Sequence, residues 1–259
     1  MKWTIKETIN YTKRFYHVLD TGDASPLLSL SPRVKQHAMT SLANWAKYTG
    51  RYDKFQQIKQ RYNLNWLKVD STIHLQRFFN EGLTLDVMIQ RIRQMIRLLP
   101  ERMAKIIKYA CLEGLRASEV LESVKVINNG DKEAFVQYYD SVQLTLNHWK
   151  LPGMIRSTKK AFLSFITPQM LQIVQNIDKV PTLNAITPVC RHKGIKMEMY
   201  LCRKIFASWL RKEGIAAEAV DALQGRVSQS ILTRHYLVPS QSLKDDVLQA
   251  LGKLQLQLD

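Results

Sequence analysis

Apolar residues recur at intervals of three and four along most of this chain, and that spacing restricts its fold more than any other feature. In the stretch "SPRVKQHAMTSLANWAKYTG", residues 31–50, five apolar side chains share one helical face: Val34, Ala38, Leu42, Trp45 and Ala46. Ser31 and Pro32 are start signals for a helix, and Gly50 is a stop signal. The pattern predicts an amphipathic helix, and similar patterns cover nearly the whole sequence.

Only residues 134–167 depart from this helical spacing. The stretches "AFVQYYDSVQLTLNHW" and "KKAFLSFIT" alternate apolar and polar residues, and Pro152 and Gly153 lie between them. Alternation with a turn signal is typical of paired strands. We therefore predict a mainly α protein with one small β-sheet or hairpin.

The 259 residues predict two domains. A basic, all-helical module occupies residues 1–70, and the stretch "NLNWLKVDST" interrupts the helical pattern near its end. Its aromatic residues Tyr52, Phe55 and Tyr62 are expected in the core. Residues 71–259 form the second domain and contain the predicted sheet.

The chain carries 38 Lys and Arg against 22 Asp and Glu, a formal charge of +16, and residues 1–70 alone hold 12 basic and 5 acidic residues. Such an excess favours a polyanionic partner, for which double-stranded DNA is the first choice. An anionic membrane and general solubility are the alternatives. No apolar run reaches the ~18 residues of a membrane span, and the start does not resemble a secretion signal, so we expect a cytoplasmic protein. Three cysteines without paired spacing are expected to be buried.

Familiar catalytic motifs are missing. The acidic residues are scattered, and neither a phosphate-binding GxxxxGK[ST] loop nor a GxSxG or HExxH motif occurs. We therefore expect no metal and no nucleotide cofactor. The unusual residues are arginines, of which the first, Arg116, follows the stop signal Gly114 at a junction between two predicted helices.

A second arginine lies on the apolar stripe of a later helix. The stripe consists of Tyr200, Arg203, Phe206, Ala207 and Leu210. Arg203 is therefore predicted to face the core, where a guanidinium needs an anion. Taken alone, an internal carboxylate is the favoured partner, and a bound phosphate is the alternative.

Read in order, the motifs "GLRxSE", "YxxRxxFASxL", "LQGR" and a following tyrosine resemble those of the tyrosine recombinase (integrase) family. The resemblance covers residues 72–245 and is strongest to the divergent integrases of archaeal viruses and plasmids. Residues 1–70 resemble the core-binding domain of that family. The resemblance implies that Arg116 and Arg203 bind the scissile phosphate and that Tyr236, 33 residues beyond Arg203, is the nucleophile.

Three features differ from the usual family pattern. Tyr200 stands in place of a histidine, and a hydrogen bond from its phenol to the phosphate is the expected role. Arg226 replaces the histidine of the motif LGH, and Tyr236 follows Gly225 by 11 residues, one more than usual. For the hairpin lysine that protonates the leaving oxygen, Lys159 is the first choice, with Lys150 and Lys160 as alternatives.

The resemblance implies an enzyme that integrates a viral or plasmid genome by cleaving and rejoining duplex DNA. The intermediate would be a 3′-phosphotyrosyl link that needs neither metal nor ATP. Several protomers, from a dimer to a tetramer, would assemble on paired sites. The alternatives are a non-catalytic DNA-binding protein on the same scaffold and a DNA-relaxing enzyme similar to type IB topoisomerases.

Overall fold

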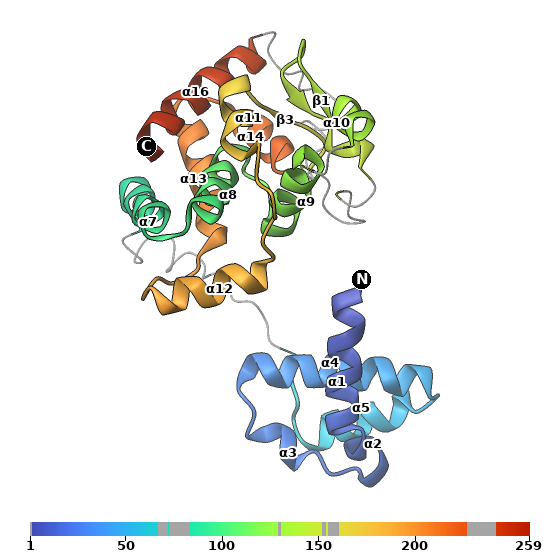
Figure 1. Cartoon of the computed structure of the whole chain (residues 1–259). Coiled ribbons are helices and arrows are strands. Elements are labelled where there is room, and N and C mark those ends of the chain that lie inside the picture. Colours follow the sequence, from blue (N-terminus) through green and yellow to red (C-terminus); the bar gives the residue numbers. More distant parts are fainter. Residues whose placement is uncertain are drawn as a thin grey trace. The chain divides into compact units, whose positions relative to one another are not determined.

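The computed structural model describes residues 2–66, 72, 83–128, 131–151, 154, 161–226 and 242–259, with side chains from residue 8 onward. The chain divides into two compact units, residues 1–82 and 83–259 (Figure 1). The boundary predicted near residue 70 lies outside the described residues. Helices dominate both units, and one small sheet is present, so the predicted fold class is confirmed.

The described part of the first unit contains the helices α1 (Lys2–Phe15), α2 (His17–Thr21), α3 (Ser25–Leu28), α4 (Pro32–Tyr48) and α5 (Tyr52–Arg61). Pro32 occupies the first turn of α4, and Gly50 follows its end with a φ of +68°. Ala38, Leu42 and Ala46 are fully buried, as the apolar face predicts. Phe55 is buried too, and Tyr52 packs against the same core.

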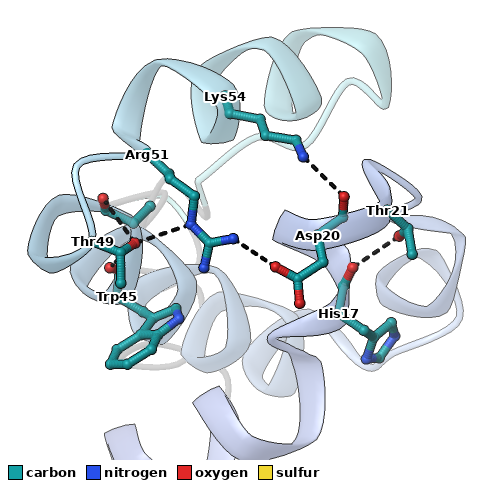
Figure 2. A network of polar contacts seen from close by, with 8 residues as sticks. His17, Asp20, Thr21, Trp45, Thr49, Arg51 and Lys54 are labelled. Carbon is teal, nitrogen blue, oxygen red and sulfur yellow. Dashed lines mark hydrogen bonds and ion pairs between the residues drawn. The ribbon is translucent and has the colours of Figure 1, made fainter.

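Polar contacts at the surface connect α2 with the start of α5 (Figure 2). Arg51, just before α5, donates from Nη1 to the Asp20 carboxylate at 2.6 Å and from Nε to the Thr49 hydroxyl at 3.2 Å. The Lys54 ammonium donates to the Asp20 carbonyl oxygen at 2.9 Å. Arg51 and Lys54, two cations of the basic module, therefore bind groups of the module itself.

Helices of the second unit are α7 (Leu85–Leu98), α8 (Glu101–Glu113), α9 (Ala117–Asn128), α10 (Lys132–Tyr138), α11 (Pro168–Val174), α12 (Leu183–His192), α13 (Met199–Lys212), α14 (Ala217–Leu223) and α16 (Leu243–Leu258). At their centre lies α8, which contacts α7, α9, α11, α13 and α16. All three cysteines are fully buried, as predicted. None of the helices in the described ranges is both long and apolar enough to cross a bilayer.

The sheet has three two-residue strands: β1 (Tyr139–Asp140), β2 (Thr145–Leu146) and β3 (Ser164–Phe165). They pair antiparallel in the order β1-β2-β3, with Tyr139 opposite Leu146 and Leu146 opposite Ser164. A short 3₁₀ turn, η1 (His148–Lys150), follows β2.

Strand structure predicted for residues 134–138 is wrong, because these residues complete helix α10. The Asp131 carboxylate accepts from the Ala134 backbone N–H at 3.0 Å and so caps the first turn. A capped helix start outweighs a short alternating pattern, since the cap satisfies a backbone donor that a helix otherwise leaves unpaired.

Candidate active site

Gly114 shapes the junction between α8 and α9. It ends α8 with a φ of +61°, in the left-handed region that favours glycine. A Cβ at this position would also overlap the ring of Phe206 on α13. The sharp turn buries Leu115 and brings Arg116 to the start of α9.

Arg116 is held by Glu119 in two ways. Its Nη1 donates to Glu119 Oε1 at 2.7 Å, and its backbone N–H donates to Glu119 Oε2 at 2.9 Å. The second bond is the helix-capping contact of a glutamate at the third helical position. The Glu119 side chain is 2% exposed and that of Arg116 20% exposed, so the pair is fixed at the edge of the core.

Glu119 was not among the residues predicted for the site. The available signal was its place three residues after Arg116, at the start of a predicted helix. A guanidinium has five N–H donors, so pairing with Glu119 leaves donors on Arg116 for an anion.

Arg203, on α13, bonds to main-chain carbonyls of two other segments. Its Nη1 donates to the Gly114 oxygen at 2.8 Å, and its Nη2 donates to the Gln224 oxygen at 3.1 Å. In return, the Gln224 amide donates to the Arg203 carbonyl at 2.9 Å. Within the described ranges, no Asp or Glu forms an ion pair with Arg203, so its carboxylate partner stays a prediction.

Arg116 and Arg226 lie near enough to Arg203 to affect its protonation. The pKa of Arg203 is lowered to about 10, first by burial and then by the positive charges of Arg116 and Arg226, while Glu119 acts in the opposite direction. Arg226, just after Gly225, is half exposed and pairs with Asp221 at 3.3 Å. Among the described residues, these three cations and two carboxylates leave an excess positive charge, which favours binding of an anion.

Tyr200 lies on the surface, one turn before Arg203. The residue is 51% exposed, and the Lys204 ammonium lies 5.4 Å from the centre of its ring. The prediction that Tyr200 shares a core-facing stripe with Phe206 and Leu210 is therefore wrong for this residue, because the buried face at the start of α13 is formed by Leu201 and Cys202.

Of the lysine candidates, the described residues include Lys150 alone. Lys150 is exposed on η1, with its ammonium 5.3 Å from the Trp149 ring. Lys159, Lys160 and Tyr236 lie outside the described residues. The site therefore consists, in the described part of the chain, of the arginines 116, 203 and 226, with Tyr200 nearby in sequence.

A buried polar chain begins at Glu113, next to Gly114. The carboxyl of Glu113 is hydrogen-bonded to the Ser164 hydroxyl, and Ser164 Oγ is hydrogen-bonded to His148 Nε2 at 2.9 Å. Burial raises the pKa of Glu113 to about 8 and lowers the pKa of His148 to about 3. Both groups are therefore neutral at pH 7 in the folded protein.

Comparison with family models gives one match. Residues 84–246, well over half of the chain, match the model described as archaeal phage integrase. The matched range contains the three arginines of the site. No curated protein sequence matches the chain.

The neutral state of Glu113 predicts an unusual dependence of stability on pH. In the unfolded chain Glu113 ionises near pH 4.5 and His148 protonates near pH 6.5, so folding gains a proton at Glu113 and excludes one at His148. Between pH 4.5 and 6.5 the two effects offset each other. Between pH 6.5 and 8 Glu113 acts alone, and the free energy of unfolding should fall by about 2 kcal/mol.

Urea unfolding of the wild type and of Glu113→Gln, at half-unit steps from pH 5 to 8.5, measures this effect. The glutamine cannot ionise, so its unfolding free energy should stay nearly constant from pH 6.5 to 8 relative to the wild type. An identical pH dependence in the two proteins would mean that Glu113 is ionised when folded.

Proposed function

Because the chain belongs to the archaeal phage integrase family, we propose that it is a site-specific DNA recombinase that works through a 3′-phosphotyrosyl intermediate. The observation that carries this proposal is the cluster of Arg116, Arg203 and Arg226: Arg203 donates to the carbonyl oxygens of Gly114 and Gln224, each of which lies two residues before one of the other arginines. The anion that such a cluster favours is, in this family, a DNA phosphodiester. The excess of basic residues in the first unit supports duplex DNA as the partner.

In the proposed reaction the phenolic oxygen of Tyr236 attacks the scissile phosphorus and loses its proton to solvent. The bond from phosphorus to the 5′ oxygen breaks, and a lysine protonates that oxygen as it leaves. Lys159 is the first choice for this role, with Lys150 and Lys160 as alternatives. Rejoining is the reverse attack by the free 5′ hydroxyl, so bond energy is retained and no ATP is consumed.

The arginines would stabilise charge on the non-bridging oxygens in the pentavalent transition state. Rigid placement matters here, because donors that are already oriented need no reorganisation during the reaction. Arg203 has this rigidity through two carbonyl acceptors, and Arg116 has it through Glu119. The exposed Tyr200 is proposed to donate a hydrogen bond to the phosphate.

Recombination between two sites requires four strand cleavages, so we propose that protomers assemble on paired sites, up to a tetramer. The DNA would be that of the host cell and of a viral or plasmid element. A non-catalytic DNA-binding protein on this scaffold would form no covalent adduct. A relaxing enzyme would act on supercoiled DNA without preference for a site.

Covalent adduct formation should depend on Tyr236. Tyr236→Phe removes one oxygen and retains the ring, so DNA affinity should change little while the adduct disappears. The measurement is denaturing electrophoresis after incubation with a nicked, labelled suicide duplex that traps the cleaved state. Tyr139→Phe serves as the matched control and should still form the adduct. An adduct formed by Tyr236→Phe would identify another nucleophile.

Arg203 should be required for cleavage. Arg203→Ala should slow adduct formation by about 10²–10³-fold, since one transition-state contact contributes ~3–4 kcal/mol. Arg211→Ala, on the same helix and exposed, is the matched control. The same assay in excess chelator and without nucleotide should give an unchanged wild-type rate. Strict dependence of cleavage on Mg²⁺ would contradict the proposed role of the arginines.

DNA affinity should decrease steeply with salt. If six or more phosphates are contacted, the affinity falls about 10³-fold or more between 50 and 200 mM monovalent salt, because counterions are released on binding. Fluorescence anisotropy with a labelled duplex measures this slope. A nearly flat response would show that the charge of +16 is not directed at DNA.

A further inference from the structure

The buried polar chain that begins at Glu113 continues through three more side chains. His148 Nδ1 is hydrogen-bonded to the Tyr138 hydroxyl at 2.9 Å, and that hydroxyl donates to Ser123 Oγ at 2.8 Å. Ser123 Oγ is in turn 2.6 Å from the Tyr109 hydroxyl. Each of these side chains is buried.

This series of hydrogen-bonded side chains starts and ends on helix α8. Glu113 and Tyr109 are four residues apart on that helix, and this spacing places both on one face. Between them the contacts pass through β3, η1, α10 and α9 in turn. One continuous set of hydrogen bonds thus connects the sheet region to the helix that precedes Arg116.

The order of the side chains argues against a second catalytic site. A hydrolytic triad places the carboxylate on the histidine, whereas here Glu113 is hydrogen-bonded to Ser164, and the other ring nitrogen of His148 is hydrogen-bonded to a tyrosine. His148 and Glu113 are 0% exposed, so no substrate reaches them. One carboxyl oxygen, Glu113 Oε1, has no hydrogen-bond partner among the described residues.

Side chains of this buried polar chain lie close in the sequence to residues proposed for catalysis. Glu113 precedes Arg116 by three residues, and Gly114 between them accepts from Arg203. On the side of the sheet, all three lysine candidates lie in the segment of the sequence between His148 and Ser164. The bonds from Glu113 to Ser164 and from Ser164 to His148 therefore connect the ends of that segment to the arginine cluster.

We propose that this buried chain positions the lysine general acid relative to the arginines, with Ser164 as its central positioning residue. The inference rests on the proposed function and names a determinant of its protonation step. Burial makes the contacts directional and strong, and a buried chain has few alternative arrangements that satisfy its groups. Loss of the Ser164 hydroxyl would leave the Glu113 carboxyl and the Nε2 atom of His148 without this hydrogen bond and break the polar connection from α8 to His148.

Ser164→Ala tests the proposal on two substrates. With an ordinary suicide duplex, cleavage should slow about 10- to 100-fold, within the range for general acid catalysis. With a duplex whose scissile 5′ oxygen is replaced by sulfur, the variant should cleave within about threefold of the wild type. A thiol has a pKa of ~8.5, so a thiolate leaves without the proton that an alkoxide requires.

Matched variants separate this role from a general loss of structure. Thr145→Val removes a hydroxyl from the neighbouring strand β2, outside the chain, and should leave both substrates unaffected. Arg116→Ala should be slow on both substrates, because sulfur does not replace a phosphate contact. Ser164→Cys retains a weak donor and should fall between the wild type and Ser164→Ala. If Ser164→Ala does not fold by circular dichroism, Tyr138→Phe takes its place in the test.

Equal slowing of Ser164→Ala on the oxygen and sulfur substrates would overturn the proposal, as would full activity on both. These outcomes differ from failure of the proposed function, in which the wild type itself forms no adduct on either duplex. Adduct formation by the wild type with no sulfur rescue of Ser164→Ala leaves the recombinase intact and rejects the positioning role.

Discussion

The bidentate contact of Arg203 with two backbone carbonyls is the interaction on which the arrangement of this site depends. It joins the end of α8, at Gly114, to the residue after α14, at Gln224, across helix α13. Since carbonyls carry only partial charge, they orient the guanidinium without neutralising it. The fold thereby keeps a partly buried cation beside Arg116 and Arg226, an arrangement that a structural ion pair would have cancelled.

This contact explains why several neighbouring positions accept few types of residue. Gly114 must turn with positive φ, leave room for the Phe206 ring and offer its carbonyl to Arg203. Any side chain there would move either the α8 end or α13, and both carry an arginine of the cluster or its support. Glu119 has a comparable double function, because it caps α9 and holds the Arg116 guanidinium with the same carboxylate.

Much of the fold was predictable from periodicity and punctuation. Pro32 and Gly50 around α4, and Gly114 after α8, mark helix ends by local chemistry alone, and Arg116 was expected at the junction that it occupies. The capped helix at 132–138 was missed because a short alternating pattern suits either a strand or a helix. The carbonyl partners of Arg203 and the six-residue polar chain were not predictable, since they connect residues far apart in the sequence and involve backbone oxygens that no residue pattern marks.

In the second unit, the charged groups and the neutral buried groups that align the helices and strands lie in different places. The arginines lie near the surface, where their positive charge favours binding of an anion. The neutral groups Glu113 and His148 lie in the interior. Neutral hydrogen bonds suit the interior because they align elements without adding charge to an already cationic cluster. A bound phosphate would therefore add negative charge beside Arg203, which forms no ion pair with the described residues, whereas Arg116 and Arg226 are already paired with carboxylates. An anion that binds only the folded state also stabilises that state. Substrate affinity and the stability of the site are therefore linked through the same three guanidinium groups.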